Sequence, residues 1–169
     1  MAKSQTKQRA RHSATSLIGL DSVKSIHLAG KLNELLANYS IFYQNARGYH
    51  WNIKGEKFFE LHLKFEEIYD KLRMNIDEIA ERILTLGESP KHNYSDYKKV
   101  STISESSEVS DGRKAVSEVL ESLGILLRLQ REIQALAVEI GDEGTSALMS
   151  DYIRAQEKEV WMYSSFLKG

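Results

Sequence analysis

The stretch Tyr49–Arg82 constrains the fold of this chain most strongly, because it carries histidines and carboxylates along one long helical segment. The residues in it that could bind a metal ion are His50, His62, Glu66, Asp77 and Glu81. An α-helix turns by about 100° per residue, so the last four share one face, spread over about 100°. The helix also rises about 1.5 Å per residue, which separates Glu66 from Asp77 by about 16 Å. One chain alone therefore cannot close all of these residues around one ion.

Long amphipathic segments predict an all-α, four-helix bundle. Apolar residues recur at steps of three and four over residues 22–51, 56–86, 111–140 and 145–167. The chain has one proline and ten glycines, so few positions interrupt these helices, and Gly141 and Gly144 are expected to separate the last two. The polar connection 88–110 is long enough for an up-down-down-up crossover between two helical hairpins, with room for a short helix at the SDYKK segment.

Length and composition are those of one ordinary domain. The 169 residues are 41% hydrophobic and 28% charged, which is normal for a globular protein. We expect residues 16–169 to form the bundle and residues 1–15, which are polar and lack periodicity, to form a flexible basic arm. The absence of cysteine excludes disulfides and thiolate metal sites and agrees with a cytoplasmic location. No apolar run approaches the length needed to cross a membrane.

The arm differs in charge from the rest of the chain. Residues 1–12 contain Lys3, Lys7, Arg9 and Arg11 and no acid. Without these four, 19 basic side chains remain against 24 acidic ones, so the body carries a formal charge of −5. The arm is either a solvated terminus or a tether for the phosphates of DNA, and several arms on an oligomer would add by avidity. A non-catalytic, DNA-binding nucleoid protein is therefore the alternative function.

Two imidazoles and three carboxylates form a donor set that suits Fe(II), Mn(II) or Zn(II). The Glu-x-x-His motif, which builds the di-iron centre inside many four-helix bundles, is absent from the sequence. The usual site within one bundle is therefore not expected.

A two-fold dimer would solve the problem of the long separation. If the helix 56–86 pairs with an antiparallel copy of itself, His62 and Glu66 of one chain face Asp77 and Glu81 of the other, and two identical sites result. The axis would pass near the middle of the helix, around positions 71 and 72. The turn that follows residue 51 would bring His50 back towards His62.

Each candidate ligand also has an ordinary structural explanation. An acid on a long helix often pairs with a base one turn away, so Asp77 could pair with Arg73, and Glu81 or Glu78 with Arg82. His62, among phenylalanines, could be a core residue, and His50 could cap the end of the helix 22–51. A dimeric bundle that binds zinc or manganese without redox chemistry would use the same donors.

The string YHWNIKGEKFFELHLKFEEIYDKLRMNIDEIAERILTLGESP resembles the signature of the Dps-type mini-ferritins, the DNA-binding proteins from starved cells. The features that carry the resemblance are HWN-x-x-G, LH-x-x-x-E, D-x-x-A-E-R and LG-x-x-P, with EVWMYSSFL near the C-terminus. The resemblance covers roughly residues 22–168. It implies ferroxidase ligands at His50, His62, Glu66, Asp77 and Glu81, and position 66 is aspartate in some members of the family.

The resemblance implies a ferritin-like fold and a homo-oligomer, a dodecameric cage built from two-fold dimers. Such a cage binds Fe(II) at inter-subunit sites, oxidises it, usually with hydrogen peroxide, and stores the Fe(III) mineral. This ferroxidase activity would protect the cell from oxidative damage, in the cytoplasm and at the nucleoid if the arm binds DNA. The resemblance also implies acidic residues at iron-entry pores near the start of the last helix, with Asp142, Glu143 and Asp151 as candidates. No membrane partner is expected.

Overall fold

The computed structural model describes residues 14–169, where every regular element is an α-helix and no strand occurs. The elements in order are α1 (Ala14–Leu17), α2 (Ser22–Asn52), α3 (Phe58–Thr85), α4 (Tyr94–Val100), α5 (Gly112–Ile140) and α6 (Glu143–Lys168). The predicted all-α bundle is confirmed. Ala14 and Thr15, which the sequence assigns to the arm, lie in α1. The basic residues Lys3, Lys7, Arg9 and Arg11 lie outside the described residues.

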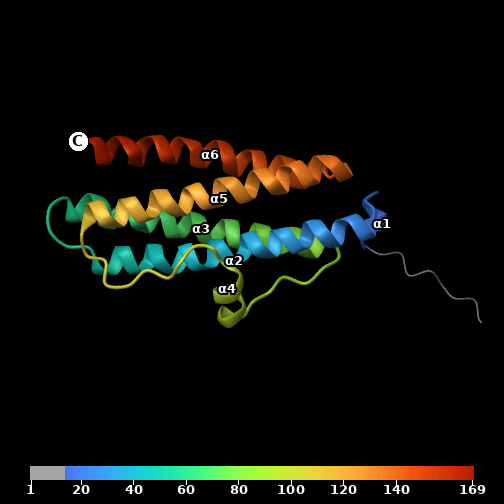
Figure 1. The fold of residues 1–169 in the computed structure, drawn as a ribbon, viewed down its shortest axis with the longest axis horizontal. Coiled ribbons are helices and arrows are strands. Elements are labelled where there is room, and N and C mark those ends of the chain that lie inside the picture. Colours follow the sequence, from blue (N-terminus) through green and yellow to red (C-terminus); the bar gives the residue numbers. More distant parts are fainter. Residues whose placement is uncertain (1–13) are drawn as a thin grey trace, which may run out of the picture.

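Four long helices lie side by side as two antiparallel hairpins, α2 with α3 and α5 with α6 (Figure 1). The chain leaves the end of α3 and travels back along the bundle before α5 begins, so α3 and α5 run in the same direction (Figure 1). This is the predicted up-down-down-up order. The short helix expected at the SDYKK segment is α4, on the crossover beside α2. No helix of the described range is both long and apolar enough to cross a bilayer.

Aspartates begin three of the long helices. The side chain of Asp21 accepts hydrogen bonds from the amides of Val23 and Lys24, both at 2.9 Å, and Asp111 caps α5 in the same way. Such a cap contributes about 1 kcal/mol because it satisfies amides that have no partner inside the helix. The expected start of the last helix at residue 145 is wrong by two residues, because Asp142 caps α6 and the helix begins at Glu143.

Only one of the two glycines expected between the last helices ends a helix. Gly141 has a φ of 75°, the left-handed conformation that terminates α5. Gly144 lies inside the first turn of α6. An aspartate directly after a helix-ending glycine is a good N-cap, so the sequence did contain the signal for the earlier start.

Asparagines of α2 hold the crossover against the bundle. The Oδ1 atom of Asn38 accepts the amides of Thr102 and Ile103, both at 3.0 Å. Two turns further along, the Nδ2 atom of Asn45 donates to the carbonyl of Ser104 at 2.8 Å. Both asparagines are buried, so these bonds are shielded from competing water. The crossover therefore has a fixed course although most of it is not helical.

A neutral polar cluster occupies the middle of the bundle, with one residue from each long helix. The hydroxyl oxygen of Tyr39 accepts the side-chain amides of Gln130 at 2.9 Å, Gln156 at 2.6 Å and Asn75 at 3.4 Å. All four side chains are buried. Because none of them is an acid or a histidine, this cluster fixes the register of the helices without offering a metal site, in keeping with the missing Glu-x-x-His motif.

Candidate metal centre

His50 and His62 meet at one end of the α2–α3 hairpin. His50 lies in the last turn of α2 and His62 near the start of α3. Their imidazole rings stack with centroids 3.8 Å apart and planes inclined by 21°. Phe58 also stacks against His62 at 5.2 Å, and Tyr69 meets His50 edge-on at 5.4 Å. The turn after α2 thus returns His50 to His62, as the sequence predicts.

The two histidines hold each other through their main chains. The Nδ1 atom of His50 lies 2.8 Å from the carbonyl oxygen of His62, and Nδ1 of His62 lies 2.9 Å from the carbonyl oxygen of His50. A carbonyl oxygen can only accept, so each Nδ1 carries the hydrogen. In the neutral rings both Nε2 atoms then keep a free lone pair, which is the form of histidine that binds a metal.

The turn between the helices runs over residues 53–57, and hydrogen bonds fix its first two residues. The amide of Ile53 donates to the carbonyl of Tyr49, and that of Lys54 donates to the carbonyl of Ser110, both at 3.0 Å. Lys57 has a φ of 59°, a left-handed conformation that costs a non-glycine residue roughly 1–2 kcal/mol. The buried side chain of Ile53 and the bond to the segment before α5 hold the turn in this shape.

Glu66 follows His62 by one turn of α3 and is half-buried. Its Oε1 atom lies 3.5 Å from the hydroxyl of Tyr69, a long contact that leaves the carboxylate largely unengaged. Tyr69 was not singled out from the sequence, although its place three residues after Glu66 puts it on the same face. Within residues 14–169 of one chain, no group of three or more histidine or acidic side chains could hold a metal ion.

Asp77 and Glu81 lie further along α3, exposed and without internal partners. Neither side chain takes part in a hydrogen bond or ion pair within the described range, so the expected alternative pairs with Arg73 and Arg82 do not form. Arg82 turns instead to Asp142. The remaining candidate partner, Glu78, accepts the hydroxyl of Tyr152 at 2.6 Å.

The pair of Arg82 and Asp142 fastens the end of α3 to the start of α6. Nη2 of Arg82 lies 2.5 Å from Oδ1 of Asp142, and its Nε donates to the hydroxyl of Thr145 at 2.8 Å. Burial favours a higher pKa for Asp142, but the hydrogen bonds from Arg82 and Thr145 outweigh it and hold that pKa below its ordinary value. Asp142 is thus a buried structural acid. Asp151 pairs with Arg154 at 2.8 Å. Of the three acids that are candidates for an iron-entry pore, only Glu143 has no partner within the described residues.

The face of α3 that carries the candidate ligands also exposes large apolar side chains. Phe59 is 77% exposed, Leu63 58%, Met74 60% and Leu84 56%. With about 100° per residue, all of them lie within about 80° of Glu66 around the helix. Exposed apolar side chains that share one helix face favour contact with a second apolar surface.

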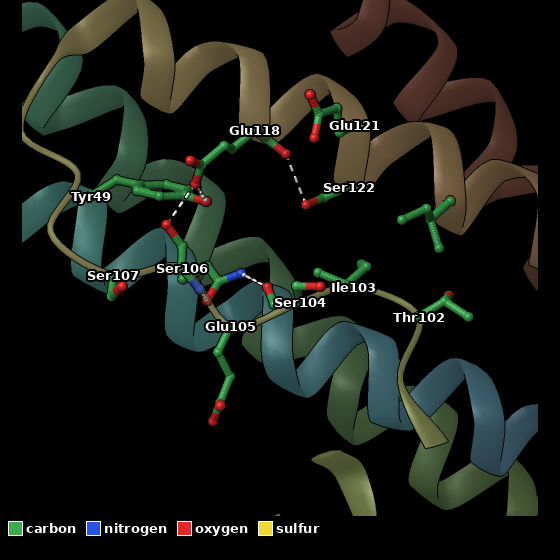
Figure 2. A pocket seen from close by; sticks show the side chains of 12 residues that line it. Tyr49, Thr102, Ile103, Ser104, Glu105, Ser106, Ser107, Glu118, Glu121 and Ser122 are labelled. Atoms are coloured by element: carbon green, nitrogen blue, oxygen red, sulfur yellow. Dashed lines mark hydrogen bonds between the residues drawn. The ribbon is translucent and has the colours of Figure 1, made fainter. Parts of the chain in front are cut away.

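A separate polar cavity of about 340 Å³ lies between α2, the crossover and α5. Figure 2 shows Tyr49 and Ser106 pointing at Glu118, to which their hydroxyls donate at 2.7 and 2.5 Å. Burial and the adjacent carboxylate raise the pKa of Tyr49. Although Tyr49 precedes His50 in the chain, none of the five candidate ligands lines this cavity, so it is not part of the metal centre.

Comparisons with known proteins agree with this architecture. The ferritin-like domain family matches residues 29–169. A DNA protection during starvation protein from Porphyromonas gingivalis is 43% identical over 135 residues, which cover 80% of this chain and 85% of that protein. A DNA protection during starvation protein 2 from Bacillus anthracis is 34% identical over 136 residues, with 80% and 93% covered.

Among solved structures, the chain resembles the crystal structure of a Dps protein from Vibrio cholerae O1. The two are 57% identical, the match covers 94% of this chain and 99% of that one, and the TM-score is 0.90. That protein is described as a member of a broad superfamily of ferritin-like diiron-carboxylate proteins. The similarity therefore extends over both helical hairpins and the crossover.

Proposed function

This chain belongs to the ferritin-like family as a Dps-type mini-ferritin, and from that premise we propose that it is a ferroxidase and iron-storage cage. It binds Fe(II) as its substrate, oxidises it with hydrogen peroxide and stores the Fe(III) mineral. The observation that carries the proposal is the mutual fixation of His50 and His62, which frees both Nε2 atoms for a metal.

The complete site requires two subunits. An antiparallel pair of α3 helices brings His50, His62 and Glu66 together with Asp77 and Glu81 of the partner subunit. Support comes from two features of one face of α3: the carboxylates of Asp77 and Glu81, which have no partner within the described residues, and the exposed apolar side chains. Two imidazoles and three carboxylates fit iron, because imidazole binds Fe(II) well and hard carboxylate oxygens favour Fe(III).

The residues of the chain bind the iron ions and offset their positive charge. They form no covalent intermediate with iron or peroxide. The locked imidazoles hold Fe(II) without first having to reorganise. The carboxylates offset the additional positive charge that appears on oxidation. Two Fe(II) ions give two electrons to one hydrogen peroxide molecule, whose O–O bond breaks, and two protons complete two molecules of water. A two-electron reduction releases no hydroxyl radical, which is how such a site would protect the cell from oxidative damage.

The proposal includes a dodecamer of two-fold dimers in the cytoplasm, with the mineral inside. Sedimentation and metal analysis of the purified protein would separate an iron-loaded cage from a dimer that holds zinc or manganese.

The catalytic part is tested by adding hydrogen peroxide to the protein and Fe(II) without oxygen and following the near-ultraviolet absorbance of Fe(III). We expect the wild type to oxidise iron faster than buffer, and the double variant His50→Ala, His62→Ala to fall to the buffer rate. The matched control replaces His27 and His92, which are exposed and remote from the site, and keeps the wild-type rate. Equal rates for wild type and buffer would refute the proposal.

A further inference from the structure

Two opposite charges lie on the exposed face of α3 between the two halves of the candidate site. Asp70 and Arg73 are both exposed, and neither side chain takes part in an ion pair or hydrogen bond within residues 14–169. Most other charged residues near the middle of this helix are engaged. Lys71, for example, turns to the opposite side and meets Glu159 of α6 at 2.5 Å.

The position of these charges matches the symmetry that the site requires. In the antiparallel pairing of the proposed function, His62 faces the partner's Glu81 and Glu66 faces the partner's Asp77. The two-fold axis then passes midway between positions 71 and 72. Asp70 and Arg73 flank that point symmetrically along the helix. Viewed down the helix axis, Asp70 lies about 40° from Glu66 on one side and Arg73 about 20° from Glu66 on the other.

The residues directly at the midpoint cannot line the axis. Leu72 is 4% exposed and belongs to the core, and Lys71 is held by α6. The side chains left to meet at the axis are therefore Asp70, Arg73 and their two copies. The same symmetry sets the exposed Phe59 opposite the partner's Leu84, so the apolar residues find apolar neighbours in the register that completes the site.

We propose that Asp70 and Arg73 form, with their copies in a second subunit, a neutral cluster of four charges on the two-fold axis that sets the register of the α3 pair. The inference rests on the proposed function for the identity of the facing residues. A slip by one helical turn, about 5.4 Å, would separate the opposite charges and also move His62 away from the partner's Glu81. Asp70 and Arg73 are positioning residues and do not touch the iron.

Charge reversal followed by mixing tests the cluster. Asp70→Arg places four guanidinium groups around the axis, and Arg73→Asp places four carboxylates there. We expect each variant alone to lose the large assembly in sedimentation velocity and to keep its helical circular dichroism. Mixed in equal amounts, the two variants are expected to recover assembly and ferroxidase activity, because each axis then joins two arginines to two aspartates. A contact within one chain cannot produce this rescue.

Two further variants complete the design. The double reversal Asp70→Arg, Arg73→Asp on one chain restores the alternation and is expected to assemble alone. The matched control reverses Lys64 and Glu67, which pair with the same spacing on another face of α3. It is expected to assemble like the wild type.

The proposed charge cluster would be refuted if both single variants assembled normally. It would also be refuted if neither the mixture of the two single variants nor the double reversal assembled. These outcomes are read from particle size. A wild-type cage that assembles but does not oxidise Fe(II) would refute the proposed function and leave the cluster to be judged by the mixing experiment.

Discussion

His50 and His62 each direct Nδ1 at the other residue's carbonyl oxygen, over distances of 2.8 and 2.9 Å. Each ring is therefore oriented by the main chain of the residue beside it rather than by a separate side chain. Hydrogen bonds of this kind fix the tautomer of a metal-binding histidine, and their loss commonly weakens metal binding 10- to 100-fold. Because the bonds join α2 to α3, the geometry of the site depends on the hairpin as a whole.

Mixing two inactive variants should restore part of the activity if the site is shared. We expect His50→Ala, His62→Ala and Asp77→Asn, Glu81→Gln each to be inactive alone. A dimer of one chain of each kind has one intact site and one site that lacks all four groups. Random reassembly would then return about a quarter of the wild-type sites.

The measurement is the initial rate of Fe(II) oxidation after unfolding and refolding the two variants together. Each variant refolded alone is the control. If the mixture stays at the rate of the separate variants, the five residues do not act across a subunit boundary.

Asp142→Asn should destabilise the protein and change its response to acid. Removing one partner of the buried pair with Arg82 is expected to cost about 3 kcal/mol of unfolding free energy at neutral pH. The folded pKa of Asp142 lies below its ordinary value. Its stabilising effect is therefore complete above the unfolded pKa, about 3.9, and is lost as the pH falls through the folded pKa. The difference between wild type and variant should shrink below pH of about 4.

Guanidinium unfolding at neutral pH and at about pH 3 measures this difference. Asp151→Asn is the matched control, because its pair with Arg154 is exposed and such pairs contribute little. A loss for Asp142→Asn no larger than for the control would contradict the assigned role.

Asn38→Ala should loosen the crossover. The substitution removes the acceptor for the amides of Thr102 and Ile103 and is expected to cost about 2 kcal/mol, since buried donors are left without partners. Hydrogen exchange, followed residue by residue, should become faster at both amides. Asn93→Ala is the control, because Asn93 is exposed and its side chain makes no cap bond to α4. Unchanged exchange in Asn38→Ala would mean that other contacts hold the crossover.

The DNA-binding alternative predicts a salt-sensitive retardation of DNA that disappears when residues 1–12 are deleted. Four basic residues in each arm would act through phosphate contacts, so binding should weaken steeply with ionic strength. Ferroxidase activity should not change, because none of the candidate ligands lies in residues 1–12. Equal DNA mobility with and without the protein at low salt would exclude the nucleoid role.

Much of the fold could be predicted from the sequence because amphipathic periodicity is a local property. The predicted helix 22–51 is observed as Ser22–Asn52, and the predicted 56–86 as Phe58–Thr85. The return of His50 to His62 could also be predicted, since a short turn between two helices leaves the chain no other course. The error at the start of α6 came from reading both glycines as breakers, when only Gly141 takes a left-handed conformation.

The partners of side chains across the bundle could not be predicted. The alternative pairing of Arg82 with Glu78 or Glu81 on its own helix does not form, and Arg82 meets Asp142 instead, sixty positions along the chain. Asn38 likewise accepts a hydrogen bond from the amide of Ile103 in the crossover, 65 positions along the chain. Such contacts depend on how the hairpins pack, which spacing along one helix does not encode.

The sequence by itself determined that this is a four-helix bundle in which four of the five candidate ligands are divided between the two halves of one helix and the fifth, His50, lies at the end of the helix before it. It could do so because helical rise and turn are the same in any protein. Only the tertiary structure decided which nitrogens of His50 and His62 remain free and which carboxylates remain unpaired. Those properties follow from hydrogen bonds between α2, α3 and α6, and these exist only once the helices are packed together.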